Sequence, residues 1–532
     1  MMYTKKWSRR EFLKITGLAA LSAGLGLWSA CSRSARRPNI LLIMADDMGF
    51  SDIGCYGSEI HTPNLDWLAE RGLRFTQFYN AARCCPTRAS LLTGLYPHQA
   101  GMGGMVSTTN PPGPYQGYLN DQCVTIAEVL GEGGYTTLMS GKWHVGEEHP
   151  HWPTDRGFDR YFGLISGAAN YFDISRTKRP DITRQMALDG EPYTPPEEGF
   201  YMTDAFTDHA VQFLNEHDRE ESSPFFLYLA YTAPHWPLHA WPEDIARYEG
   251  DYRTGWSALR KQRYDRLIEM GIIEDHWALS PPDAEVEPWS SVEDVELMDL
   301  KMAVYAAQID RMDQGIGKVL DTLRAQDELD NTLVMFLSDN GGCHEENVSD
   351  RANMNIPPGG EDSYTSYGRP WANASNTPFR LYKHWVHEGG IATPLIAYWP
   401  GVIRQQGEFT DQVGHVIDLM ATCCDVAGVK YPDKYRGREI TPLEGKSLVP
   451  IFHGRTRDGH DAIFWEHMGN KAVRRGTWKL VSTSAGKWEL YDMERDRSEL
   501  NDLADQYPEK VDELVDQYQR WAKRCGVNQK PA

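Results

Sequence analysis

The sequence predicts an α/β protein with a large mixed, mostly parallel sheet flanked by helices, and a small C-terminal α+β domain with an antiparallel sheet. Short aliphatic runs that end in polar clusters, separated by helical stretches, predict the large sheet, because the strands of a parallel sheet are buried on both faces. After Tyr431 the pattern changes to short strands that follow one another closely before a final helix. With 532 residues the chain is long enough for two domains.

Five aliphatic runs are expected to form strands of the large sheet. They are Asn39–Ala45, Tyr135–Ser140, Phe225–Tyr231, Thr332–Ser338 and Pro394–Trp399. Polar residues follow four of these runs directly, and ligands of open α/β sheets bind outside the carboxyl ends of the strands. These polar residues therefore predict a common site, with turn formation as the alternative for each of them taken alone.

Helical periodicity fills the intervals between the strands. The expected helices are Pro63–Gly72, Val124–Gly131, Thr203–His217 and Val292–Leu323, with a loop at 276–291. The C-terminal strands are expected near Ile463–Glu466, Trp478–Val481 and Trp488–Tyr491, followed by a helix at Pro508–Lys523. We accordingly divide the chain into an export signal and linker (1–37), a catalytic domain (38–430) and a C-terminal subdomain (431–532).

The first residues are typical of an export signal. Basic residues precede the apolar run Ile15–Trp28, which is too short to span a bilayer but suits the core of a signal peptide. Ser8–Lys14 resembles the twin-arginine type, which exports folded proteins, and Ser29-Ala30-Cys31 resembles a lipoprotein cleavage site. We expect a periplasmic or cell-surface protein without a transmembrane span, with the twin-arginine machinery as a partner. Cys31 is either a lipid anchor or a residue removed with the signal.

Charge and cysteine usage exclude several classes of function. The net charge of −21 argues against nonspecific binding to nucleic acid, and it means that local cations or a metal must hold any anionic substrate. The nine cysteines follow no C-x-x-C or regular spacing, so they indicate neither a zinc site nor a disulfide framework.

Cys84-Cys85-Pro86-Thr87-Arg88 is the most informative stretch of the chain. Pro86 suits the first position of a helix, so Cys84 would stand at the positive end of that helix, with Arg88 one turn further on. This arrangement presents a reactive group and a guanidinium together. A buried cysteine pair is the alternative.

The residues that follow the strands include a set of oxygen ligands and a set of cations. Asp46, Asp47, Asp339 and Asn340 offer the oxygen atoms that Ca²⁺ and Mg²⁺ prefer, with helix capping and turn formation as the alternative. Lysines can hold an oxyanion, and histidine can supply the proton that an alkoxide leaving group needs. The candidates for these roles are Lys142, His144, His235 and Lys383. For Lys383, a solvated surface position is the alternative.

Two motifs resemble one family, the type I (formylglycine-dependent) sulfatases, which are arylsulfatase-like members of the alkaline-phosphatase superfamily. Cys84-x-Pro86-x-Arg88 followed by Leu91–Gly94 is similar to the family's first motif, and Gly134–His144 is similar to its second. The resemblance covers roughly residues 38–500. It implies an alkaline-phosphatase-like fold and hydrolysis of sulfate monoesters, either aryl sulfates or sulfated carbohydrates such as polysaccharide fragments, to alcohol and inorganic sulfate.

The resemblance also implies that a separate maturation enzyme oxidises Cys84 to formylglycine, which then acts as the nucleophile. The motif register selects Cys84, whereas Cys85 stands where many members have serine. Together with the modified Cys84, four residues would hold one divalent cation, Ca²⁺ with Mg²⁺ as the alternative. These four are Asp46, Asp47, Asp339 and Asn340.

The remaining roles are likewise what the resemblance implies. Arg88 would orient and stabilise the hydrated aldehyde, and Asp339 would accept the proton of the attacking hydroxyl. His235 would protonate the departing alcohol, and His144 would take the proton of the second hydroxyl. The sulfate would be bound by Lys142, His144, His235 and Lys383. A phosphonate or phosphate ester hydrolase on the same scaffold, or a noncatalytic glycan-binding surface protein, are the alternative functions.

Overall fold

The computed structural model describes residues 36–177, 182–220, 223–346 and 356–527. The described residues from Pro38 onward form one compact unit. The predicted export signal and Cys31 lie outside the described residues. Among the helices of the described residues, none is long and apolar enough to cross a membrane.

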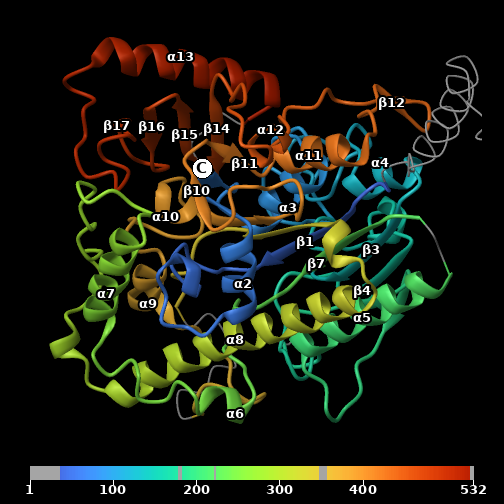
Figure 1. Ribbon diagram of the computed structural model, residues 1–532. Helices are drawn as coiled ribbons and strands as arrows, with labels where there is room; N and C mark the ends of the chain where they lie inside the picture. The colour runs from blue at the N-terminus through green and yellow to red at the C-terminus, as the bar shows by residue number, and fades with distance from the viewer. Residues whose placement is uncertain (1–35, 178–181, 221–222, 347–355, 528–532) are drawn as a thin grey trace, which may run out of the picture. The chain divides into compact units, whose positions relative to one another are not determined.

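An 11-stranded sheet forms the centre of this unit (Figure 1). Its strand order is β10-β2-β9-β8-β1-β7-β3-β4-β5-β6, with β11 also paired to β2. The strands are β1 (Asn39–Ala45), β2 (Leu73–Tyr79), β3 (Thr136–Gly141), β4 (Arg160–Leu164), β5 (Met186–Leu188), β6 (Glu191–Tyr193), β7 (Phe225–Ala230), β8 (Thr332–Ser338), β9 (Ala392–Tyr398), β10 (Glu408–Thr410) and β11 (Gly414–His415). The central strands run parallel, whereas β9 is antiparallel to both neighbours, which confirms the predicted mixed, mostly parallel sheet.

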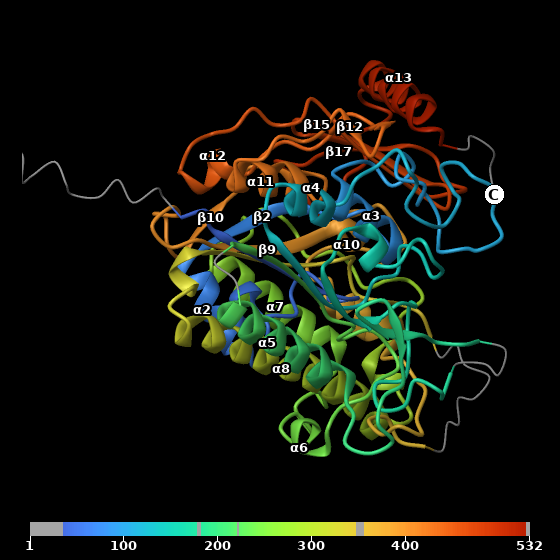
Figure 2. The same cartoon turned by 90° about the vertical axis from the view of Figure 1, so that its right-hand side faces the viewer.

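Helices cover both faces of the sheet (Figure 2). The side chains of β1 alternate, so that Leu41 and Ile43 pack with α2, α5 and α8, whereas Ile40 and Leu42 pack with α3, α4 and α11. The helices are α2 (Pro63–Arg71), α3 (Cys84–Thr93), α4 (Ile126–Glu132), α5 (Met202–Glu220), α6 (Pro242–Ile245), α7 (Trp256–Glu269), α8 (Val295–Ala325), α9 (Gly368–Ser375), α10 (Glu388–Ile391), α11 (Asp418–Ala427), α12 (Val449–Phe452) and α13 (Pro508–Cys525). Short 3₁₀ turns occur at Gly54–Tyr56, Thr154–Arg156, Trp289–Ser291 and Leu329–Asn331.

The C-terminal part is the predicted small antiparallel sheet with one helix, but it has four strands, because Asn470–Arg475 forms a strand that was not predicted from the sequence. Its strands are β14 (Ile463–His467), β15 (Asn470–Arg475), β16 (Trp478–Ser482) and β17 (Glu489–Asp492), and a small ribbon, β12 (Lys434–Tyr435) and β13 (Arg438–Glu439), precedes them. One face of this sheet packs on the main core through Trp465 and Val481, and the other packs under α13 through Val473 and Leu480. The domain boundary near residue 430 stays a prediction.

Capping residues set the ends of several helices. Asp294 accepts a hydrogen bond from the backbone of Leu297 at 2.9 Å, so α8 starts at Val295 and not at the predicted Val292. Thr125 and Glu128 form a capping box that starts α4 at Ile126. Gly94, with a φ of +69°, ends α3 in the left-handed conformation that glycine adopts without strain.

Candidate active site

The register of the central strands brings the polar residues that follow them together. Ala45 of β1 pairs with Ser338 of β8, and Gly141 of β3 pairs with Ala230 of β7. The residues that follow β1, β3 and β8 therefore emerge side by side at one edge of the sheet, and Lys142 Nζ lies 2.5 Å from Asp46 Oδ2.

Four oxygen-bearing side chains form the centre of the site. The backbone N–H of Asp47 donates to Asp339 Oδ1 at 3.2 Å, and Asn340 Nδ2 donates to Asp47 Oδ1 at 2.7 Å. All four are buried, and in the described parts of the chain Asp46 Oδ1 and Asn340 Oδ1 have no hydrogen-bond partner. Burial, together with the neighbouring carboxylate of Asp46, raises the pKa of Asp339 well above its usual value. Unpartnered buried oxygens beside crowded carboxylates fit a hard divalent cation.

Each carboxylate of this group also has a cationic neighbour. Arg88 donates to Asp339 Oδ2 at 2.9 Å, and Lys383 Nζ lies 2.7 Å from Asp47 Oδ1. Burial alone would raise the pKa of Asp46, but Lys142, His235 and Arg88 hold it well below its usual range. Arg88, Lys142 and Lys383 thus surround an acidic centre, and these three cations can also face an anionic substrate.

Lys383 is only 1 % exposed, so it is not a solvated surface lysine. The loop between α9 and α10 brings it to the site, where its backbone N–H donates to the carbonyl of Gly342 at 3.2 Å. The next residue, His384, is bonded through its backbone to Ala82 just before α3. A loop anchored at both the β8 end and the α3 start therefore positions the lysine.

Cys84 lies at the start of α3, with Arg83 as the N-cap. Because the helix begins at Cys84, Pro86 occupies its third position and not the predicted first. The hydrogen bond from the Cys85 thiol, with the charge of Lys142, lowers the pKa of Cys84 well below its usual value despite burial. The helix start thus favours an anionic group at position 84.

The neighbouring Cys85 contacts His144. Its sulfur lies 3.4 Å from Nε2 and 3.5 Å from Nδ1 of that ring. Burial raises the pKa of Cys85 well above its usual value and lowers the pKa of His144 to about 4. Near neutral pH, His144 is therefore an uncharged imidazole that can accept a proton.

His235 has a defined orientation in the site. Its Nδ1 lies 2.6 Å from the carbonyl oxygen of Trp236, which can only accept, so Nδ1 carries the hydrogen. Nε2 lies 3.3 Å from both Lys383 Nζ and Asp47 Oδ2 and accepts from the lysine. His235 Nε2 therefore faces the centre of the site.

Sequence reasoning missed Glu345, which links several parts of the site. Its carboxylate accepts from Arg83 at 3.0 Å and from Trp236 Nε1 at 3.0 Å. Burial alone would raise its pKa, but Lys383, Arg83 and His235 hold that pKa well below its usual range. Its position six residues after Asp339 was the only sequence signal available.

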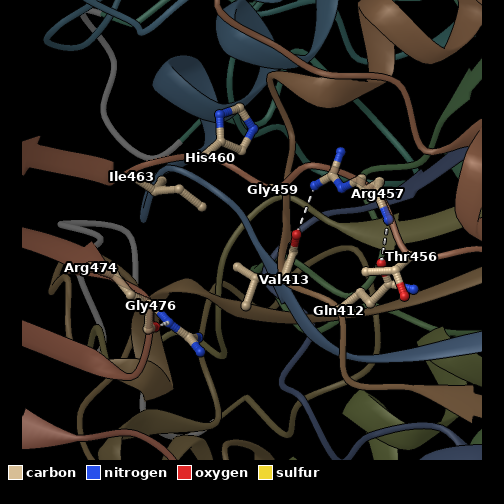
Figure 3. Close-up of a pocket in the computed structure, with 9 residues that line it drawn as sticks. All are labelled: Gln412, Val413, Thr456, Arg457, Gly459, His460, Ile463, Arg474 and Gly476. Carbon is tan, nitrogen blue, oxygen red and sulfur yellow. Dashed lines mark hydrogen bonds between the residues drawn. The ribbon is translucent and has the colours of Figure 1, made fainter.

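A separate cavity of about 240 Å³ lies under the segment that precedes β14 (Figure 3). Arg457 and His460 line it, and both contact the buried carboxylate of Asp418, at 2.8 and 2.6 Å. None of the predicted site residues lines this cavity. Its charged groups Arg457 and His460 therefore pair with Asp418 and not with the strand-end residues.

Comparison with known proteins gives concordant matches. Residues 38–429 match the family described as Sulfatase, and residues 379–524 match the C-terminal family of N-sulphoglucosamine sulphohydrolase. The chain is 36 % identical to an arylsulfatase of Klebsiella aerogenes, over 79 % of this chain and 93 % of that protein. It is also 36 % identical to an uncharacterized sulfatase of Schizosaccharomyces pombe, over 93 % of this chain and 95 % of that protein. The crystal structure of Ps i-CgsB in complex with k-i-k-neocarrahexaose has a TM-score of 0.68 at 27 % identity, with 93 % of this chain and 94 % of that chain covered.

Proposed function

This chain belongs to the sulfatase family and is a sulfuric ester hydrolase, and we propose that it uses a formylglycine made from Cys84 to hydrolyse sulfate monoesters of aryl alcohols or carbohydrates. The observation that carries the proposal is the set of groups placed around Cys84. The residue stands at a helix N-terminus, and the buried cations Lys142 and Arg88 converge on the oxygen centre beside it.

The oxygen centre supports a divalent cation as cofactor. Asp46, Asp47, Asp339 and Asn340 would hold it together with the modified Cys84, and the all-oxygen donor set favours Ca²⁺, with Mg²⁺ as the alternative. When bound, the cation supplies positive charge that offsets the carboxylates and stabilises the negative charge of the sulfate group. The unpartnered oxygens of Asp46 and Asn340 are the atoms that support this assignment.

Formylglycine supplies a hydrated aldehyde, which has one hydroxyl to attack sulfur and a second whose deprotonation expels sulfate. Arg88, fixed by Asp339 and by the carbonyl of Lys142 at 2.9 Å, would orient that group. Asp339 is the proposed acceptor of the first proton, because burial and the carboxylate of Asp46 raise its pKa and so make it a stronger base. His144, an uncharged imidazole beside the start of α3, is the proposed acceptor of the second proton.

The sulfate and the leaving group require the remaining side chains. Lys142 donates one hydrogen bond to Asp46 and has further N–H donors with which to bind a sulfate oxygen. His144, His235 and Lys383 are proposed to complete the sulfate site. His235 Nε2, which accepts from Lys383, can pass a proton from the lysine side to the departing alcohol oxygen.

The names of similar proteins support the substrate class. The Klebsiella relative is an arylsulfatase, and the similar crystal structure contains a carbohydrate, k-i-k-neocarrahexaose. We propose an aryl sulfate or a sulfated glycan as substrate, with export through the twin-arginine machinery to the periplasm or cell surface. A formylglycine-generating enzyme is the proposed maturation partner, and Cys31 is a candidate lipid anchor.

The test combines peptide mass with activity. After coexpression with a maturation enzyme, the peptide containing Cys84 should have the mass of formylglycine, and the protein should release sulfate from an aryl sulfate. A Cys84 that stays a thiol in an active preparation would overturn the nucleophile assignment. Faster turnover of an aryl phosphonate than of an aryl sulfate would replace the proposal with phosphonate hydrolysis. Absence of turnover and of bound divalent metal would favour a glycan-binding protein.

A further inference from the structure

The first hairpin of the C-terminal sheet extends toward Cys84. β14 and β15 are joined by Met468 and Gly469, which have φ values of +51° and +85° and form a tight two-residue turn. Trp465 and His467 lie on the buried face of β14, two residues apart. Trp465 Nε1 donates to the carbonyl of Asn80 at 2.8 Å, so this face of β14 lies against the segment that leads into α3. His467, two residues further along the strand, lies on the same face.

Hydrogen bonds on both sides fix this hairpin. Glu466 Oε2 accepts from Tyr115 at 3.1 Å and lies 2.7 Å from His98 Nε2. On the other side, Asn470 Nδ2 donates to His384 Nε2 at 3.2 Å and to the carbonyl of His467 at 3.1 Å. The hairpin therefore holds its side chains in a defined place beside the loop between α9 and α10 that carries Lys383.

His467 is fully buried, yet neither of its ring nitrogens has a hydrogen-bond partner in the described parts of the chain. Its ring stands edge-on to His384, with the two centroids 5.4 Å apart. Its electrostatic neighbours are Arg83, His384, Cys84 and His98. A buried imidazole without a hydrogen-bond partner destabilises the fold, which indicates that a ligand supplies the missing partner when it binds.

His384 connects this imidazole to the sulfate side of the site. It follows Lys383 directly, its backbone N–H donates to the carbonyl of Ala82 at 2.8 Å, and its φ of +91° is rare for a side chain other than glycine. Such strained positions gather at functional sites. His384 thus adjoins Lys383 in the chain, and His467, whose electrostatic neighbours include Cys84, packs against the His384 ring.

We propose that His467 and His384 bind the alcohol part of the substrate, by hydrogen bonds to a free hydroxyl next to the sulfate ester. The inference rests on the proposed function and narrows its substrate class. A neutral imidazole has one donor and one acceptor, which matches a hydroxyl, whereas the lysines and Arg88 match the anionic sulfate. Burial, with Arg83 and His384 nearby, lowers the pKa of His467 well below its usual value and so keeps it neutral. The preferred substrates are therefore hydroxyl-bearing sulfate esters, such as sulfated sugars.

The test compares two chromogenic substrates that differ by one hydroxyl, 2-hydroxy-4-nitrophenyl sulfate and 4-nitrophenyl sulfate. The measured quantity is the ratio of their kcat/KM values in the mature wild type and in His467→Phe. Loss of a neutral hydrogen bond should lower this ratio about tenfold, mainly through KM. His467→Asn, which keeps a donor and an acceptor, should recover part of the ratio. Formylglycine content and Tm are measured for every variant.

His415→Phe is the matched control. His415 is also fully buried and packs against Trp465 with centroids 5.6 Å apart, but its charged neighbours are Asp418 and His460. This variant should keep the wild-type ratio. Should His467→Phe fail to fold, His384→Asn tests the same site, because asparagine tolerates the left-handed backbone, and its ratio should also fall.

A ratio within threefold of wild type in His467→Phe, or in His384→Asn where that variant replaces it, would overturn the inference. An equal loss on both substrates would do so as well, because it indicates a structural role. If the mature wild type hydrolyses neither substrate, the proposed function itself fails.

Discussion

Three side chains of the site stand on backbone that residues other than glycine rarely adopt. Asp47, His144 and His384 have φ values of +68°, +58° and +91°. Each such position costs of the order of 1–3 kcal/mol, which the surrounding fold must offset. The identity of these residues alone does not indicate this backbone conformation.

Removal of divalent metal should destabilise the protein. Asp46, Asp47 and Asp339 repel one another unless a cation lies among them, and a ligand at about 100 times its Kd stabilises the fold by about 2.7 kcal/mol. We expect Tm to fall in EDTA and to recover on addition of Ca²⁺. An Asp47→Asn, Asp339→Asn double variant serves as the control and should show a smaller recovery. Identical Tm values in EDTA and Ca²⁺ would contradict the metal assignment.

The two adjacent cysteines should respond differently to substitution. Cys84→Ser should lower kcat by at least about 10³-fold, because loss of a covalent nucleophile is rarely compensated. Cys85→Ser keeps a small polar group beside His144 and should retain activity within about tenfold. The measurement is kcat for an aryl sulfate, with formylglycine content determined for each protein. The reverse order of effects would show that Cys85 is the working residue.

At the scale of elements, α10 is joined to the C-terminal sheet by buried ion pairs. Lys479 Nζ lies 2.8 Å from Glu388 Oε1 and 2.8 Å from Glu499 Oε1, and Arg497 Nε lies 2.9 Å from Glu388 Oε2. Glu388 comes five residues after Lys383, so this cluster also fixes the end of the loop that carries the lysine. The C-terminal sheet therefore supports the end of the loop that carries Lys383.

Removing the charge of Glu388 should lower the free energy of unfolding. Glu388→Gln leaves Lys479 and Arg497 buried without their full counter-charge, which typically costs about 3–5 kcal/mol. Glu489→Gln is the matched control, because Glu489 and Arg380 are each 30 % exposed and such pairs contribute about 0–1 kcal/mol. Urea unfolding gives both values. Equal losses of unfolding free energy in the two variants would show that the buried cluster stabilises the fold no more than a partly exposed ion pair does.

The elements also show what the sequence could predict. β1, β3, β7 and β8 lie at the centre of the sheet as near-continuous aliphatic runs, and the motifs at their ends identified the strand-end residues. β2 was missed because it alternates polar and apolar residues, with Arg74 and Gln77 only partly buried. His467 and Glu388 could not be assigned, because their surroundings depend on how the C-terminal sheet docks on the large one.

At the scale of the whole molecule, buried neutral histidines should make the fold sensitive to mild acid. His239 Nδ1 accepts from the backbone of Tyr171, and Nε2 donates to the carbonyl of Ser363, so the ring is uncharged. Burial lowers the pKa of His239 to about 4 and that of His415 to about 3. Below pH 6.5 the unfolded chain therefore binds more protons than the folded one, and the free energy of unfolding decreases as the pH is lowered.

We expect the free energy of unfolding to fall by about 1.4 kcal/mol per pH unit for each such histidine between pH 6.5 and about 4. Urea unfolding at several pH values measures the slope. His415→Phe removes one titrating group, so its slope should be smaller than that of the wild type by about that amount. A stability that does not change between pH 6.5 and 5 would contradict this prediction.

Cys84 is 2 % exposed, and every residue of α3 is buried. An enzyme that oxidises this thiol must surround it with its own catalytic groups, and the packed helix leaves no room for that. The proposed modification must therefore come before folding, whereas a twin-arginine signal belongs to a route that carries folded chains. The order of events would be oxidation, folding and then export. The maturation enzyme would accordingly work in the compartment where the chain is made, and the protein would cross the membrane with its nucleophile already in place.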